Sequence, residues 1–168
     1  MRVMGIDCGG EYTGFGIVEG DPTGHLECVT VGAIRLSPRE RLEIRLDRVF
    51  TQLCEIMQEH RPEVVAIEDV FFAANAKSAL KLGHVRGVAM LAASRCGLAV
   101  EAYAPLAIKS AVVGYGRAEK AQVQVMVARL LRLADPPKPS DAADALAIAI
   151  CHVHTATTLS RLHARARG

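Results

Sequence analysis

Met1-Arg-Val-Met-Gly-Ile-Asp-Cys-Gly-Gly10 is a short apolar run that ends in an acid and two glycines. This pattern predicts a buried strand over residues 3–7 followed by a turn. Asp7 therefore closes a strand whose other residues are mostly apolar. Because burying an isolated carboxylate is costly unless it is paired or binds a metal ion, this acid is a candidate functional residue.

Two more strands are expected next to this one. Residues 13–19 alternate in polarity, residues 21–24 (Asp-Pro-Thr-Gly) have the composition of a turn, and residues 28–36 form a third apolar stretch. Three successive strands with short connections predict an antiparallel meander.

The rest of the chain alternates helices with single strands. Ser37 and Pro38 are expected to open a helix that runs to His60. The later expectations are strands over 63–71 and 98–103, and helices from a cap at Asn75 to about Cys96, from Pro105 to near Gly114, over 118–133, and from Ser140 to about Leu159. This order predicts an α/β fold with a five-stranded mixed sheet and helices on both faces.

Composition sets broad limits on the class of protein. The 168 residues are 51% hydrophobic and fit one domain over 1–168, with a basic, flexible tail expected from about residue 160. No apolar run is expected to span a bilayer and no signal-peptide pattern is visible, so we expect a cytoplasmic protein without membrane contact. The five scattered cysteines favour a reducing compartment over a disulfide framework or a zinc site.

Three more acids lie in apolar or small-residue surroundings. Glu68 follows Val64-Val-Ala-Ile, and Asp141 and Asp144 are three residues apart on one face of the last predicted helix. Each acid alone has a structural explanation, such as a turn, an ion pair or a favourable helix N-terminus. Together they predict a site for Mg²⁺ or Mn²⁺ and two-metal phosphate chemistry.

Basic residues suggest a polyanionic partner less strongly, because the net charge is only +2. These residues either lie on solvated faces of helices or, taken as a set, contact phosphates. The set comprises Lys77, Lys81, Arg86, Lys109, Arg117 and Lys120, with further arginines at Arg161, Arg165 and Arg167. Separately, residues 5–18 resemble the phosphate loop of the actin, heat-shock chaperone and sugar-kinase superfamily, but the chain lacks the second domain and second loop of those kinases.

Across nearly its whole length the chain resembles the RuvC-type Holliday-junction resolvases. The resemblance lies in residues 5–7 (Gly-Ile-Asp), 66–75 (Ala-Ile-Glu-Asp-Val-Phe-Phe-Ala-Ala-Asn), 78–89, 108–120 and 141–152 (Asp-Ala-Ala-Asp-Ala-Leu-Ala-Ile-Ala-Ile-Cys-His). It implies an RNase H-like fold with strands 4 and 5 parallel to strand 1. It also implies a homodimer that needs two Mg²⁺ ions per active site, for which Mn²⁺ substitutes, and that makes paired nicks in four-way junction DNA.

Particular residues match the motifs of that family. The resemblance implies that Asp7, Glu68, Asp141 and Asp144 form the catalytic acidic tetrad, that Phe71 stacks on bases at the opened crossover, and that Lys109 and Lys120 contact DNA. With the other basic residues, Phe72 and Asn75 complete the expected DNA-binding set. One of the two phenylalanines should instead be core, because adjacent strand residues point to opposite faces.

A stripe of small residues on one helix suggests a second interface. Ala79, Gly83 and Gly87 either pack on the protein's own sheet or, as the resemblance implies, form a two-fold dimer interface. A branch-migration motor complex is a further partner implied by the resemblance. His152 and His154 are expected to contact the C-terminal dipole of the last helix.

Cys8 departs from the family, which usually has Pro in an Asp-Pro-Gly turn. We expect activity to survive, and hypothesise sensitivity to thiophilic metals or oxidants. Two functions from other classes remain open: a phosphoryl-transfer fragment of the actin-like kinase type, and a junction-binding or scaffolding protein that does not cleave DNA.

Overall fold

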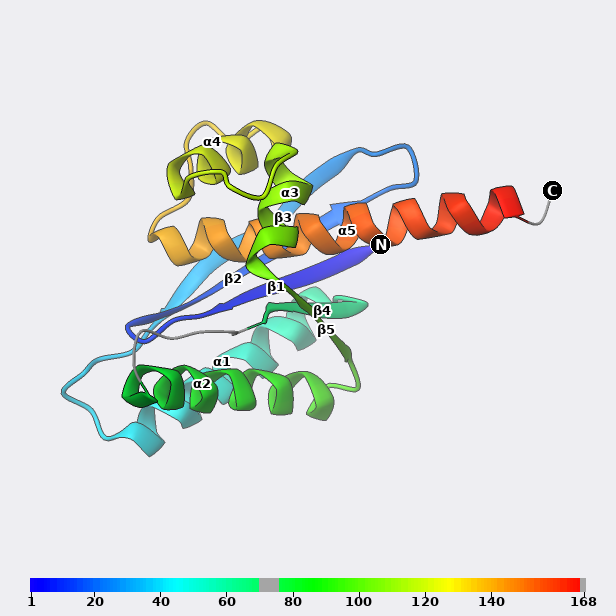
Figure 1. Cartoon of the computed structure of the whole chain (residues 1–168). Helices are drawn as coiled ribbons and strands as arrows, with labels where there is room; N and C mark the ends of the chain where they lie inside the picture. Colours follow the sequence, from blue (N-terminus) through cyan, green and yellow to red (C-terminus); the bar gives the residue numbers. More distant parts are fainter. Residues whose placement is uncertain (70–75, 167–168) are drawn as a thin grey trace.

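The computed structural model describes residues 1–69 and 76–166. Its centre is a five-stranded sheet of order β3-β2-β1-β4-β5 (Figure 1). The strands are β1 (Arg2–Cys8), β2 (Tyr12–Gly20), β3 (Leu26–Arg35), β4 (Val64–Glu68) and β5 (Ala99–Tyr103). The pairs β1–β2 and β2–β3 are antiparallel, whereas β1–β4 and β4–β5 are parallel. The predicted meander and mixed sheet are therefore confirmed.

Helices cover both faces of the sheet, as expected (Figure 1). One face carries α1 (Leu42–His60) and α2 (Ala76–Arg95), and the other carries α3 (Pro105–Val113), α4 (Lys120–Leu130) and α5 (Ser140–Ala166). Because successive strand residues point to opposite faces, β1 contributes to two cores. Met4 and Ile6 belong to the α1–α2 side, and Val3 belongs to the α5 side.

Glycines on β1 and β2 allow α5 to lie directly on the sheet. A Cβ atom added at Gly5 would stand 2.0 Å from the Ala145 carbonyl oxygen, and one at Gly14 would stand 1.9 Å from the Asp141 carbonyl oxygen. Any side chain at either position would push the helix away. The same short separation brings the first turns of α5 over the end of β1.

Two predicted boundaries, the start of α1 and the end of β4, are wrong. α1 begins at Leu42 rather than at Ser37, because Ser37 makes a separate turn: its hydroxyl accepts from the Arg39 N–H at 3.3 Å, and its carbonyl accepts from the Glu40 N–H at 3.2 Å. β4 ends at Glu68 rather than at residue 71. The ends expected for α1, at His60, and for α2, just before Gly97 with its φ of 73°, are confirmed.

The last two helices also differ from the sequence expectation. α4 spans Lys120–Leu130 rather than 118–133, because Glu119 and Gln122 form a reciprocal capping box that fixes its start. α5 continues to Ala166, past the predicted end at Leu159. The described part of the expected C-terminal tail is thus helical.

The composition of α5 also corrects the expectation about membrane-spanning runs. Ser140–Ala164 is long and apolar enough to cross a membrane by length and composition, with a mean hydropathy of 1.2. Of the 18-residue window that has this hydropathy, 56% is buried in the protein. Packing against β1 and β2 accounts for this apolar character, as in the core helix of a globular fold.

Candidate active site

Asp7 and Glu68 lie side by side at the carboxyl end of the parallel pair β1–β4. Ile6 pairs with Ile67, so Asp7 and Glu68, which follow these two residues, lie next to each other at the ends of their strands. Asp7 is on the same strand face as Gly5, and Glu68 on the same face as Ala66, which is the face covered by α5. Alternation along two strands therefore directs both carboxylates toward α5.

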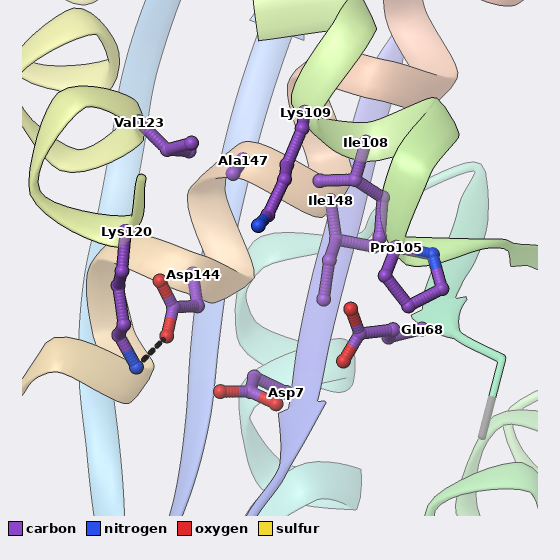
Figure 2. A pocket seen from close by; sticks show the side chains of 10 residues that line it. All are labelled: Asp7, Glu68, Pro105, Ile108, Lys109, Lys120, Val123, Asp144, Ala147 and Ile148. Atoms are coloured by element: carbon purple, nitrogen blue, oxygen red, sulfur yellow. Dashed lines mark ion pairs between the residues drawn. The ribbon is translucent and has the colours of Figure 1, made fainter. Parts of the chain in front are cut away.

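The first turns of α5 bring the other two acids to this point. Asp144 lines the same cavity as Asp7 and Glu68 (Figure 2). Asp141 lies beside the turn after β1: a Cβ atom added at Gly9 would stand 2.7 Å from its Oδ1. The structure thus gathers all four predicted acids, with Asp141 at the edge and the other three facing the cavity.

The cavity has a volume of about 240 Å³ and combines charged and apolar walls. Lys109 and Lys120 extend into it from α3 and α4 (Figure 2). The remaining wall is apolar and is made of Pro105, Ile108, Val123, Ala147 and Ile148. Charges in such a half-apolar setting interact more strongly than they would in water.

The carboxylates raise one another's proton affinity. Burial, together with repulsion from Asp144, Glu68 and Asp141, raises the pKa of Asp7 to about 7 against the opposing effect of Lys120. Burial and then Asp144 also raise the pKa of Glu68, against Lys120 and Lys109. The cluster is short of positive charge, which is the electrostatic condition that a bound cation relieves.

Divalent cations fit the chemistry of these donors, although the carboxylates do not converge on a single point. Carboxylate oxygens are the ligands that Mg²⁺ and Mn²⁺ prefer. Within residues 1–69 and 76–166, no group of three or more His, Cys, Asp or Glu side chains is arranged to hold a metal ion. In Figure 2, Asp144 Oδ2 is paired with Lys120 Nζ at 2.5 Å.

The other predicted DNA-binding residues fall into three groups. Lys81 and Arg117 are exposed, on α2 and on the turn before α4. Arg86 is occupied within the protein, because its Nη2 lies 3.3 Å from Asp69 Oδ1 and its Nε donates to the Glu68 carbonyl at 3.4 Å. Outside the described residues lie Phe71, Phe72, Asn75 and the side chain of Lys77.

The small-residue stripe on α2 faces away from the sheet. Gly83 and Gly87 are exposed, and a Cβ atom added at either would meet nothing within 4 Å. The alternative that these two glycines pack on the protein's own sheet is therefore wrong. Ala79 is half-buried, and Leu80 and Leu91 nearby are 62% and 53% exposed.

Neither of the two histidines makes the contact expected of it, and the Cys8 thiol is largely protonated. Because α5 continues to Ala166, neither His152 nor His154 is at a helix C-terminus: His152 Nδ1 shares a 2.8 Å hydrogen bond with the Tyr103 hydroxyl, and His154 Nδ1 lies 3.0 Å from the Ala111 carbonyl. Burial, followed by the charge of Asp7, raises the pKa of the Cys8 thiol to about 12. That shift disfavours the reactive thiolate.

Sequence reasoning missed the structural roles of Arg86 and Gly9. Arg86 was grouped with the phosphate contacts because it belongs to a basic set, and nothing in its sequence neighbourhood indicates an approach to β4. Gly9 carried a usable signal, since a glycine after a strand-ending acid marks a turn. Its second property, the close approach of Asp141, depends on the packing of α5.

The sheet order and the position of the acids define a class. A β3-β2-β1-β4-β5 sheet, with acids from β1, β4 and a helix crossing the sheet, has the RNase H-like architecture. The family model for the crossover junction endodeoxyribonuclease RuvC matches residues 3–152, and the chain belongs to this family.

Individual relatives agree with this assignment. The chain is 69% identical to the crossover junction endodeoxyribonuclease RuvC of Koribacter versatilis over 166 residues, which covers 99% of this chain and 100% of the relative. It is 54% identical to the protein of the same description from Acidobacterium capsulatum, covering 98% and 100% of the two chains.

A solved structure gives the same fold. RuvC of T. thermophilus in complex with a Holliday junction substrate superimposes with a TM-score of 0.86 at 34% identity, covering 94% of this chain and 96% of that one. The yeast mitochondrial Holliday junction resolvase Ydc2, at 13% identity and a TM-score of 0.66, shares the fold.

Proposed function

We propose that this protein is a structure-selective DNA endonuclease that resolves four-way (Holliday) junctions by paired, symmetric nicks in recombination and repair. One observation carries the proposal. The carboxylates of Asp7, Glu68 and Asp144 face one cavity, in a chain that aligns over 94% of its length with a RuvC solved on junction DNA. Membership of the family supports the same reaction class.

The acidic tetrad would hold the metal ions. Asp7, Glu68, Asp141 and Asp144 supply oxygen ligands suited to two Mg²⁺ ions per active site, or to Mn²⁺ in their place. When bound, such ions activate water and stabilise the leaving oxygen of a phosphodiester. The acids would neutralise and position these charges.

DNA contacts follow from the positions of the basic residues. Lys109 and Lys120 reach the cavity and would meet the phosphates next to the scissile bond. Lys77, Lys81 and Arg117 would bind phosphates farther out, which positions the duplex arms without reading their sequence. Phe71 would stack on an unpaired base at the crossover, with Phe72 and Asn75 beside it.

A homodimer would explain why two nicks are made symmetrically. Gly83 and Gly87 are exposed on α2, with the half-buried Ala79 on the same helix, and would permit close approach of a second copy's helix, which would cover the exposed leucines nearby. Two-fold symmetry then presents two identical sites to two strands of like polarity. We place the protein in the cytoplasm and include a branch-migration motor complex among its partners.

A synthetic four-way junction tests the proposal directly. We expect metal-dependent, symmetrically placed paired nicks on a sequencing gel with Mg²⁺, none in EDTA, and little cutting of a linear duplex that contains the same sequence. Tight junction binding without nicking would instead identify a non-cleaving scaffold. Hydrolysis of ATP in the absence of DNA would identify the kinase-like alternative.

A further inference from the structure

Lys120 interacts electrostatically with all four acids, and most closely with Asp144. Its Nζ is paired with Asp144 Oδ2 at 2.5 Å, and it lies close enough to Asp7 and Asp141 to interact with both electrostatically. An ammonium group at this position does part of what a cation would do, because it offsets mutual repulsion among the carboxylates. Asp144 is at the same time one of the oxygen donors expected to bind metal.

The start of the helix that carries Lys120 is fixed by a cap, whereas the Lys120 side chain is more than half exposed. Lys120 is the first residue of α4, whose start is fixed by the Glu119–Gln122 capping box, and the buried Val123 anchors the next turn. The Lys120 side chain is 59% exposed, against 24% for Asp144. A long, half-exposed side chain on a fixed helix can leave one partner and reach another without any backbone change.

Lys109 provides an internal comparison. It lines the same cavity from α3, but no ion pair joins it to the other side chains drawn in Figure 2. The two lysines thus bring the same charge to one cavity, and Lys120 alone of the two holds an acid there. A general effect of positive charge and a specific effect of the Asp144 pair can therefore be separated.

We propose that Lys120 is a built-in counter-ion of the metal-free site, which a divalent cation must displace from Asp144, and that the displaced amine then binds a DNA phosphate. The proposal rests on the metal site in the proposed function and deepens it. Pairing with Lys120 lowers metal affinity in the DNA-free protein. Because metal binding frees a phosphate ligand, metal and DNA should bind cooperatively, with equal coupling in both directions.

Mn²⁺ binding to the DNA-free protein tests the first half of this proposal. Affinity is measured by electron paramagnetic resonance or calorimetry in wild type, Lys120→Met and the matched variant Lys109→Met, each with its fold checked by circular dichroism. We expect Lys120→Met to bind Mn²⁺ roughly three- to tenfold more tightly than wild type. Lys109→Met should gain clearly less.

Two results would overturn this half of the proposal. One is an Mn²⁺ affinity of Lys120→Met that is unchanged or weaker than that of wild type, and the other is an equal gain in Mn²⁺ affinity in Lys109→Met. An Asp7→Asn variant separates failure of the inference from failure of the metal site. If Asp7-dependent Mn²⁺ binding is seen but Lys120→Met leaves it unchanged, only the counter-ion role fails. If neither wild type nor Lys120→Met shows Asp7-dependent binding, both proposals fail.

The salt dependence of junction binding tests the second half. Each phosphate contact contributes about 0.9 to the slope of log affinity against log salt. We expect Lys120→Met to reduce the slope by about one contact in Ca²⁺, used as a metal that need not support cleavage, and to change it little in EDTA, where Asp144 holds the amine. Lys109→Met should reduce the slope similarly in both conditions, and an equal loss for Lys120→Met in both would overturn the transfer.

Discussion

Arg86 on α2 is bound to Asp69 just beyond the end of β4, with Nη2 and Oδ1 3.3 Å apart, and its Nε donates to the Glu68 carbonyl at 3.4 Å. The Arg86 side chain is 24% exposed. The helix that carries the exposed Gly83 and Gly87 is therefore bonded to the backbone of a candidate metal ligand. Arg86 therefore links α2 to the end of β4, which is also held by pairing of Glu68 with Tyr103 on β5.

Arg86→Ala should lower the cleavage rate more than junction affinity. Loss of the two bonds frees the end of β4 and misplaces Glu68, which at about 1.4 kcal/mol gives a decrease of about tenfold in kcat. Single-turnover cleavage and junction titrations separate the two quantities. Arg86→Lys should recover part of the rate, because a lysine can still reach Asp69.

Arg117 provides the control for this prediction. It is exposed on the turn before α4, so Arg117→Ala should lower junction affinity and reduce the salt dependence of binding, and should leave kcat unchanged. If Arg86→Ala behaves like Arg117→Ala, Arg86 is a DNA contact and not a link between α2 and β4.

Neutralising any one of the three cavity acids should abolish DNA cleavage without abolishing junction binding. Asp7→Asn, Glu68→Gln and Asp144→Asn each remove a charged oxygen donor from the cavity while preserving its shape. Because bound metal supplies several kcal/mol of transition-state stabilisation, we expect cleavage to fall by about a thousandfold or more with junction binding retained. Retained turnover in any of the three, measured on a four-way junction with Mg²⁺, would contradict the metal assignment.

The raised pKa of Asp7 predicts how the stability of the metal-free protein varies with pH. Folding shifts the pKa of this carboxyl from 3.8 to about 7, so the folded state binds the proton more tightly than the unfolded state. Stability from this group is present below about pH 4 and is lost as the pH rises through 7. Charge on Asp7 thus destabilises the metal-free fold at neutral and higher pH.

Asp7→Asn should remove the loss of stability that the metal-free protein shows as the pH rises through 7. At about 1.4 kcal/mol per tenfold change in proton affinity, the variant should be more stable than wild type by about 2–4 kcal/mol at pH 8 in EDTA, and nearly equal to it at pH 4. Urea unfolding at both pH values measures the difference. A gain of the same size at pH 4 would show that packing, and not ionisation, is responsible.

The sequence was sufficient for the features that depend on local pattern. Alternation and turn residues placed β1 and β2, and the strand expected over 63–71 contains β4 although it was drawn too long. Because β1 and β4 are parallel neighbours, Asp7 and Glu68 could be brought together before any coordinates. Helix starts were less accurate, since the turn at Ser37 competes with a cap at the same residue. The Lys120–Asp144 and Arg86–Asp69 pairs join separate elements, so they depend on tertiary packing that no local pattern encodes.

A charge on the open face of α2 should separate the protomers of the proposed dimer. A Cβ atom added at Gly87 meets nothing within 4 Å in the monomer, and replacing a glycine inside a helix removes a helix-destabilising residue. We expect a monomeric mass by light scattering and loss of paired nicks. Gln52→Glu adds the same charge to the exposed side of α1 and should remain dimeric. An unchanged mass for Gly87→Glu would place the interface elsewhere.

Gly14 should be required for the position of the acids on α5. A Cβ atom there would stand 1.9 Å from the Asp141 carbonyl oxygen and 2.3 Å from its carbonyl carbon, and a helix backbone cannot yield locally as a side chain can. Gly14→Ala must therefore displace the first turn of α5, at a cost of about 1–3 kcal/mol, and move Asp141 and Asp144 away from Asp7. Gly10→Ala, on the neighbouring turn with nothing within 4 Å, is the matched control and should cleave normally. Because partial unfolding alone would also reduce activity, Mn²⁺ affinity should be compared at a temperature where both variants are fully folded. There the Gly14 variant should bind metal more weakly, and equal affinity would show that the close approach of α5 to β2 serves stability alone.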